Sequence, residues 1–351
     1  MTRRRADRER ITIQDVAERA GVSKMTVSNV VNRTGKVGAA TRSRVLGMIE
    51  ELGYVPSQAA RHLVGSAAAR IGLLYRDVES MFLNVAVADI SIAVAERGLQ
   101  LLVRRAVDSS PEETERVTRS LKRSGADGLL LIPPYPEVLS GSDLRRELGI
   151  PMVAIATAQP FPDIATVRID NFAAAKAMAD LLISRGYRRI AFVTGPARHS
   201  DSQARLEGYK AALAAHGLPF DPKLCVEGLF TFASGIEAAN RLFALTPRPD
   251  AVMAANDDMA TAILWVAHSL NFRLPEDLAV TGFDDTLVAT RVWPTLTTIR
   301  QPLAAMAGHA IDILVEALRQ PAPAAADRVL DFALVERGSI RSGREKPGET
   351  R

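Results

Sequence analysis

The chain has 351 residues, of which 47% are hydrophobic and 24% charged, and its formal net charge is +4. This length allows two or three domains that each bury a core. The single cysteine, Cys225, excludes an internal disulfide and favours a reducing cytoplasm. The charged first ten residues and the absence of a long apolar run argue against a signal peptide and a membrane span.

The charge is divided unevenly along the chain. Residues 1–63 hold twelve Lys/Arg and six Asp/Glu, a net charge of +6, so the remainder carries −2 (+4 minus +6). A basic end on a slightly acidic body predicts contact with phosphates through that end alone. The five arginines of residues 1–10 form a basic tail, which is either a disordered solubilising segment or a DNA contact.

Residues 11–32 predict two short helices joined by a tight turn. Thr12 can cap the first helix with Asp15 three residues on, Gly21 suits the positive φ of a turn, and Ser23 can cap the second helix. Small and branched apolar residues recur at helical spacing on one face of each helix: Val16, Ala17, Ala20, Val27, Val30 and Val31.

The opposite face of the second helix carries a polar stripe suited to DNA bases. Its members are Lys24, Met25, Ser28 and Asn29, which pair at i,i+4 spacing. Lysine can donate to guanine, asparagine can pair with adenine and methionine can pack on a thymine methyl group. We assign phosphate contacts to Ser23, Thr26, Asn32 and Tyr54. The alternative is an ordinary helical hairpin with a solvated polar face.

A third helix is predicted over residues 41–52, with Val45, Met48, Ile49 and Leu52 on its inner face. Pro56 then starts a piece of about two turns, too short to be stable alone. This piece is either a flexible linker or a hinge helix that orders on DNA, with Leu63 as an apolar wedge in the minor groove.

The order DVAERAGVSKMTVSNVVN, TRSRV and LGYVPSQAARHL resembles the lactose-repressor family of bacterial transcription regulators. The resemblance implies a homodimer on a pseudo-palindromic operator, with Ala60 and Arg61 at the minor groove and paired Leu63 side chains opening a central base step. Two residues depart from the family pattern. Asn29 stands where arginine is usual, which favours adenine over guanine, and Gly38 replaces a serine that often contacts phosphate.

From residue 71 short apolar runs alternate with helical patterns, which predicts doubly wound parallel sheets. The predicted strands are 71–75, 99–103, 128–132, 152–156, 165–169, 190–194, 251–255 and 278–283, followed by a last strand near 329–336. The predicted helices include 171–185, 202–216, 234–245, 257–270 and 302–319.

So many strands predict two lobes with a cleft, and the chain crosses between them near 169–176. The fold class is thus an all-α helix-turn-helix headpiece joined by a hinge helix to a two-lobe α/β sensor body. By resemblance this body is like the periplasmic sugar-binding proteins. The predicted boundaries are a tail at 1–10, a DNA-binding domain at 11–56, a hinge and linker at 57–70, an effector-binding and dimerisation domain at 71–340 and a tail at 341–351. Lobe 1 takes 71–169 and 300–326, and lobe 2 takes 170–298 and 327–340.

Ligands of open α/β sheets lie beyond the carboxyl ends of the strands, so polar residues at those ends are the candidates. The family motifs give Arg205 in R-x-x-G-Y, Asn256 in N-D-x-x-A and Asp284 in G-F-D-D, with Phe230 and Phe82 as aromatic contacts. A carboxylate, an amide and an arginine beside an aromatic ring suit a sugar-like effector.

Each candidate has a structural alternative. Asp257 and Asp285 are candidate helix caps, Arg205 could pair with a carboxylate, and Phe82 and Phe230 could be core residues. Thr157 stands where the lactose-binding member has an acidic residue after the fourth strand, which weakens the case for a galactoside.

No catalytic motif, metal-binding spacing or cofactor motif stands out, so we expect a regulator and not an enzyme, without metal or cofactor. Three interpretations stay open. The chain is a cytoplasmic, nucleoid-associated repressor of carbohydrate genes released by a sugar-like inducer, a corepressor-dependent regulator on the same scaffold, or an α/β ligand-binding protein or enzyme with an incidental helical leader.

Overall fold

The structure is a computed structural model, and it describes residues 13–31, 37–52, 68–76, 80–319 and 326–342. It divides into two compact units, Met1–Ala68 and Ala69–Arg351. The predicted hinge helix, including Ala60, Arg61 and Leu63, lies outside the described residues, as do Asn32 and Tyr54. These assignments stay predictions.

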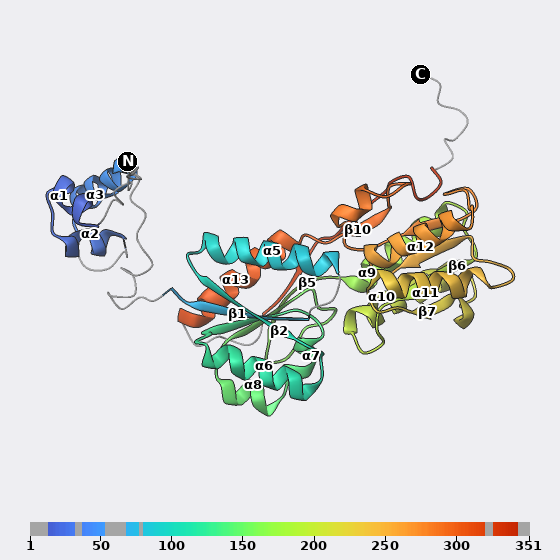
Figure 1. Cartoon of the computed structure of the whole chain (residues 1–351), viewed down its shortest axis with the longest axis horizontal. Coiled ribbons are helices and arrows are strands. Elements are labelled where there is room, and N and C mark those ends of the chain that lie inside the picture. Colours follow the sequence, from blue (N-terminus) through green and yellow to red (C-terminus); the bar gives the residue numbers. More distant parts are fainter. Residues whose placement is uncertain (1–12, 32–36, 53–67, 77–79, 320–325, 343–351) are drawn as a thin grey trace, which may run out of the picture. The chain divides into compact units, whose positions relative to one another are not determined.

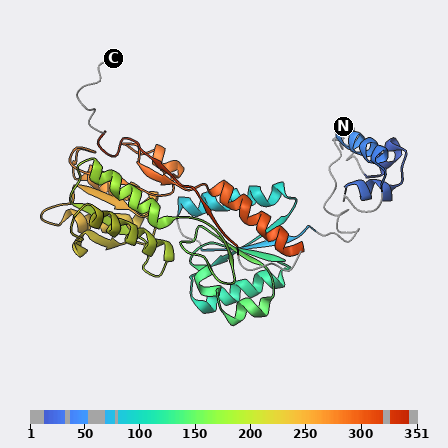
Figure 2. The ribbon, with the colours of Figure 1, turned by 180° about the vertical axis from the view of Figure 1, so that it is seen from behind.

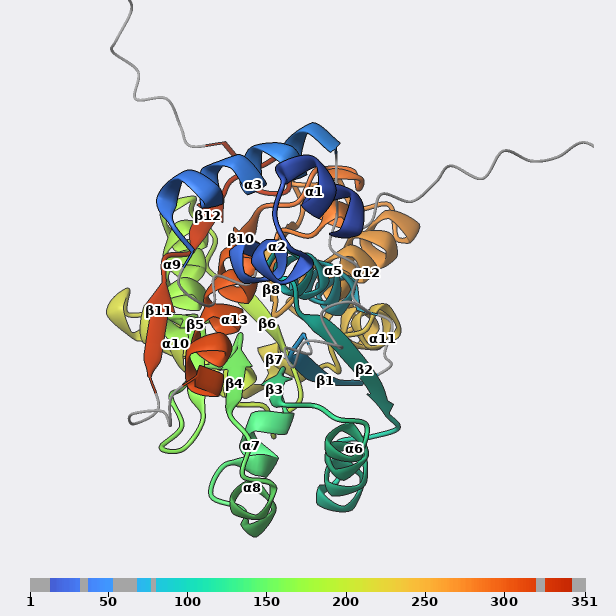
Figure 3. The same cartoon turned by 90° about the vertical axis from the view of Figure 1, so that its left-hand side faces the viewer.

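The described part of unit 1 contains three helices that pack on one another (Figure 3): α1 (Ile13–Ala20), α2 (Lys24–Val31) and α3 (Ala39–Leu52). Their shared core consists of Val16, Ala17, Ala20, Val27, Val30 and Val45. Gly21 has a φ of 63° in the turn, and the Ser23 hydroxyl accepts a bond from the Thr26 backbone N–H at 3.1 Å. Both predictions for the turn are therefore confirmed, while α3 begins two residues earlier than predicted.

Lobe 1 of unit 2 is built on a six-stranded parallel sheet in the order β11-β5-β4-β3-β1-β2. The strands are β1 (Arg70–Arg76), β2 (Gln100–Ala106), β3 (Gly128–Leu131), β4 (Met152–Ile155), β5 (Ala165–Ile169) and β11 (Asp327–Leu330). Helices α5 (Met81–Glu96) and α13 (Leu303–Arg319) lie side by side on one face, and α6 (Pro111–Arg123), α7 (Tyr135–Leu139) and α8 (Asp143–Leu148) lie on the other (Figures 1 and 2).

Lobe 2 is built on a four-stranded parallel sheet in the order β7-β6-β8-β9. The strands are β6 (Ile190–Thr194), β7 (Cys225–Glu227), β8 (Ala251–Ala254) and β9 (Ala279–Thr281). Its helices are α9 (Asn171–Ser184), α10 (Ser200–Ala215), α11 (Phe232–Phe243) and α12 (Asp257–Ser269), with short 3₁₀ turns η1 (Pro222–Leu224) and η2 (Leu287–Thr290). A separate antiparallel pair joins β10 (Thr298–Arg300) to β12 (Ala333–Val335).

The chain passes between the lobes three times, after β5, after β10 and after β11. The predicted first crossing near 169–176 is confirmed, because β5 lies in the lobe 1 sheet and α9 packs on α10 of lobe 2. The assignment of all of 327–340 to lobe 2 is wrong, because β11 pairs in parallel with β5 of lobe 1. The stretch near 329–336 is two strands, one for each lobe, and not one.

Candidate effector site and DNA-reading surface

The carboxyl ends of strands from both lobes surround one pocket, which encloses about 700 Å³ of empty space, part of it open to solvent. All five effector candidates chosen from the sequence line this pocket: Phe82, Arg205, Phe230, Asn256 and Asp284. Lobe 2 supplies most of its polar groups, whereas lobe 1 supplies mainly apolar side chains and prolines, with Arg76 and Ser80 as its polar members. The pocket thus has a polar wall and an apolar wall.

Backbone strain is concentrated at this pocket. Ala156, Phe230 and Asp284 line it, and their φ angles are 58°, 61° and 110°. Each such conformation costs on the order of 1–3 kcal/mol for a residue other than glycine and occurs mostly at functional sites. The strain is typical of a functional site and supports the choice of this pocket as the candidate site.

Arg205 lies in the polar wall of the pocket and is almost fully buried, with only 4% of its surface exposed. Its Nε donates to Asn171 Oδ1 at 2.9 Å, its Nη1 donates to the Ala255 carbonyl, and its guanidinium lies 3.7 Å from the centre of the Phe283 ring. The nearest carboxylate in an ion pair is Asp201, at 3.8 Å. These contacts, together with Asp201 beside Nη2, fix the guanidinium plane in the lining of the pocket.

Asp284 is the buried carboxyl of the polar wall, and Gln301 donates to its Oδ1 at 2.7 Å. Burial raises the pKa of Asp284 well above its ordinary value, Arg205 opposes this shift, and Asp257 adds to it. Burial deprives this carboxyl group of hydrogen bonds to water, and a ligand hydroxyl that reached it would supply one in their place.

Asn256 has a structural role in addition to its place in the pocket. Its Oδ1 accepts from the Met259 N–H at 3.0 Å, so it is the N-cap of α12, and its Nδ2 donates to the Phe230 carbonyl at 2.9 Å. The cap was expected from Asp257, and that alternative is wrong. Asn256 also fixes the strained backbone of Phe230, whose ring packs near His199 with centroids 5.8 Å apart.

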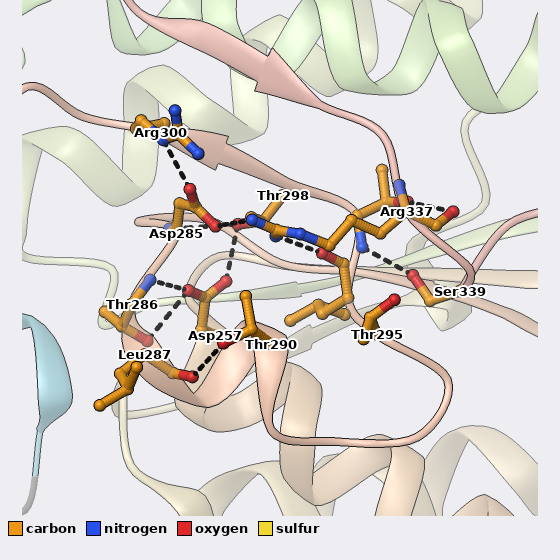
Figure 4. A network of polar contacts seen from close by, with 12 residues as sticks. Asp257, Asp285, Thr286, Leu287, Thr290, Thr295, Thr298, Arg300, Arg337 and Ser339 are labelled. Carbon is orange, nitrogen blue, oxygen red and sulfur yellow. Dashed lines mark hydrogen bonds and ion pairs between the residues drawn. The ribbon is translucent and has the colours of Figure 1, made fainter.

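Asp257 and Asp285 form the centre of a polar network behind the pocket (Figure 4). Asp257 accepts from the Thr286 backbone at 2.7 Å and from the Thr298 hydroxyl at 2.7 Å. Asp285 pairs with Arg300 and Arg337, both at 2.6 Å, so it is not a helix cap either. This network ties the loop after β9 to β10 and to the segment after β12.

The network predicts a pH dependence of stability. Burial raises the pKa of Asp257 to about 7, although its bonds from Thr298 and Thr286 favour the charged form. In the unfolded chain this carboxyl ionises near its ordinary pKa of 3.8. Between these two values only the folded state keeps the proton, so the stability that the neutral carboxyl contributes falls progressively as the pH rises from about 4 and is lost just above pH 7.

We therefore expect the Tm to go on falling from pH 6.5 to about 7.5 and then to level off, with a loss worth up to about 1 kcal/mol in this last part of the range, and Asp257→Asn to flatten this slope. Asp284 acts in the same direction. Burial lowers the pKa of His199 below 6.5, so the stability that its neutral ring contributes is lost only as the pH falls below about that value. Calorimetry at constant ionic strength measures the slope. A Tm that rises with pH, or an equal slope in Asp257→Asn, contradicts the role of Asp257.

Sequence reasoning missed four polar residues that line the pocket: Arg76, Ser80, His199 and Asp201. Arg76 ends β1, and His199 and Asp201 follow β6, so the strand-end rule could have found them. Phe82 is half-buried and packs against the main core as well as lining the pocket. In the part of the chain that the structure describes, no cluster of histidine, cysteine and acidic residues could hold a metal ion.

In unit 1 the predicted DNA-reading stripe is only partly exposed. Met25 is 63% exposed, Lys24 is exposed and Asn29 is half-buried. Ser28 is only 7% exposed, so its predicted place on the exposed stripe is wrong, whereas its base contact stays a prediction. It lies about 100° around the helix from Val27 and is small enough to be covered at the edge of the apolar face. Base readout by Lys24, Met25 and Asn29 stays a prediction.

Asn29 supplies a direct test of this surface. Sites selected from random DNA should show adenine at one symmetric position per half-site, with a discrimination of about 1–3 kcal/mol, and Asn29→Arg should shift that position to guanine. Asn29→Ala should lose the preference but keep salt-dependent binding. If Asn29→Ala selects the same sites as the wild type, Asn29 does not read a base.

Comparisons with known proteins cover both units. The family model "Bacterial regulatory proteins, lacI family" matches residues 12–57, and the model "Periplasmic binding protein-like domain" matches residues 179–340. The HTH-type transcriptional regulator CelR of Thermobifida fusca is 35% identical over 95% of this chain and 99% of its own length. The ribose operon repressor of Escherichia coli is 33% identical over 93% of this chain and 99% of its own length.

Solved structures match over the same extent. The transcriptional regulator CelR–cellobiose complex has a TM-score of 0.69 at 33% identity and covers 94% of this chain and 100% of that chain. The lac repressor dimer bound to operator and the anti-inducer ONPF has a TM-score of 0.72 at 25% identity, with 95% and 100% coverage. No helix among the described residues is long and apolar enough to span a membrane.

Proposed function

The chain belongs to the lacI family of bacterial regulatory proteins, and we propose that it is a homodimeric repressor of carbohydrate uptake or catabolism genes, released from its operator by a small sugar-like inducer. The family consists of DNA-binding transcriptional regulators, so the protein is a regulator and not an enzyme. We place its action in the cytoplasm, on the nucleoid.

One observation carries the effector assignment, namely the pocket with a polar wall and an apolar wall. Arg205, Asn256 and Asp284 offer a fixed donor fork, an amide and a buried carboxyl on the same wall. Phe82 and Phe230 offer ring faces beside them. A sugar presents hydroxyls at its edge and C–H groups on its faces, and this arrangement matches both. The names of the CelR and ribose relatives support the same ligand class.

The mechanism that we propose couples closure of the pocket to the hinge. Without inducer, the sensor bodies hold two hinge segments together, and Leu63 of each wedges the minor groove of the operator. An inducer that binds better to a second arrangement of the lobes shifts the population toward it and separates the hinges. The inducer acts only through this difference in affinity.

A corepressor-dependent regulator would use the same pocket, so the direction of the response must be measured. A thermal-shift screen of cellobiose, ribose and other sugars and small metabolites, followed by operator binding with each hit, separates the two. Weaker operator binding supports the inducer. Stronger binding supports a corepressor, and stabilisation by non-carbohydrate metabolites alone overturns the sugar assignment.

A further inference from the structure

Two long helices that border the pocket begin without a side-chain cap from their own lobe. α5 follows Ser80 and α10 follows His199, and neither N-cap side chain accepts a bond from the helix it precedes. Both N-cap residues line the pocket. The first N–H groups of a helix have no partner inside the helix, and a side-chain oxygen normally accepts from one of them.

Each of these two helices instead meets a carboxylate from the opposite lobe. Asp258, in α12 of lobe 2, accepts from the Met81 backbone N–H that begins α5, at 2.9 Å. Glu137, in α7 of lobe 1, accepts from the Ser200 hydroxyl that begins α10, at 2.6 Å. The two contacts therefore cross between the lobes in opposite directions.

Other helices of the sensor body show that this arrangement is not the general one. Five of them have as N-cap the side chain of the residue just before the helix: Ser110 for α6, Ser142 for α8, Asp170 for α9, Thr231 for α11 and Asn256 for α12. The short helix α7 follows Pro134 and also lacks such a cap.

The two carboxylates are placed for this contact and not for the ligand. Neither lines the pocket. Burial raises the pKa of both Asp258 and Glu137, while the bonds to Met81 and Ser200 oppose this shift. Among the described residues, Glu137 Oε2 is buried without a hydrogen-bond partner, and the other carboxylate oxygen, Oε1, accepts from the Ser200 hydroxyl. Burying a carboxyl group is costly unless such bonds are made.

We propose that Asp258 and Glu137 form a reciprocal clasp that stabilises the closed pocket: Asp258 of lobe 2 caps α5, and Glu137 of lobe 1 holds the first residue of α10 through the Ser200 hydroxyl. Separation of the lobes breaks both bonds together, which uncaps α5 and releases the start of α10. The clasp therefore favours the closed arrangement of the two lobes over the open one, whichever small molecule fills the pocket. This inference does not depend on the effector being a sugar.

Hydrogen exchange of the full-length protein without ligand tests the clasp. The two bonds join separate pairs of segments, so loss of one bond can weaken the other only through movement of the lobes. Asp258→Ala should speed exchange at least threefold in residues 199–207, the start of α10, as well as at α5. Glu137→Ala should do the same in residues 80–88, the start of α5. Asp258→Asn and Glu137→Gln keep one acceptor oxygen and should give smaller changes of the same pattern. These two variants replace the alanine variants in the test if an alanine variant folds poorly.

Ser110→Ala is the matched control, because it removes a cap that acts within lobe 1. It should speed exchange only at the start of α6. The clasp is overturned if each carboxylate variant affects only the helix that it touches. Uniform acceleration in all helices, α6 included, also overturns it, because that result indicates loss of global stability and not opening of the lobes.

Discussion

Replacement of Arg205 by alanine should abolish the response to the effector and leave operator binding unchanged. The guanidinium is buried in the polar wall, and a charge-assisted hydrogen bond from it to a ligand in the pocket is worth about 1.5–3 kcal/mol. Loss of one such bond lowers effector affinity at least about 10-fold, and loss of two lowers it at least about 100-fold. Titration calorimetry with the sugar found by thermal shift measures the loss, and operator binding with and without that sugar measures the response.

Two variants sharpen this test. Arg205→Lys keeps the charge but loses the planar fork, so it should bind the effector nearly as poorly. Arg189→Ala removes another lobe 2 arginine, which does not line the pocket and forms an ion pair with Asp221 at 3.4 Å. This variant should respond normally to the effector. Since Arg205 also bonds Asn171 and Ala255, the Tm of each variant shows that it is folded. Normal induction of folded Arg205→Ala would exclude a ligand contact.

Much of the sensor body could be predicted because its strands are continuous apolar runs. The runs at 71–75, 128–132 and 190–194 became β1, β3 and β6 with nearly the expected bounds. Parallel strands place their carboxyl ends at one edge of a sheet, so motifs far apart in sequence meet there. This rule brought Arg205, Asn256 and Asp284 to one pocket, although their binding of an effector stays a prediction.

The remaining features depend on tertiary contacts that leave little local signal. β7 and β10 have three residues each, too few to show a period. β11 is largely exposed and half of its four residues are charged, and its pairing with β5 at the sheet edge makes it a strand of lobe 1. Asn256 caps α12 in place of Asp257, because Thr286 and Thr298 come from distant segments to bind Asp257.

Replacement of Leu63 by serine should weaken operator binding about 10- to 100-fold while effector affinity stays near that of the wild type. Leu63 lies outside the described residues, so this prediction rests on the sequence after Pro56 and on membership of the family. A leucine buried between base pairs contributes about 1.5–3 kcal/mol, which serine cannot replace. Fluorescence anisotropy with operator DNA at fixed salt measures the change, since salt alone alters such affinities strongly.

The matched control is Leu46→Ser, which makes the same change at a leucine of α3 that is 50% exposed in unit 1. It should alter operator affinity less than threefold, because no apolar contact of comparable size is lost. Equal weakening by both variants would mean that serine acts by destabilising the DNA-binding domain. Unchanged affinity in Leu63→Ser would show that the segment after Pro56 is a linker, and the coupling between pocket and operator would then need another route.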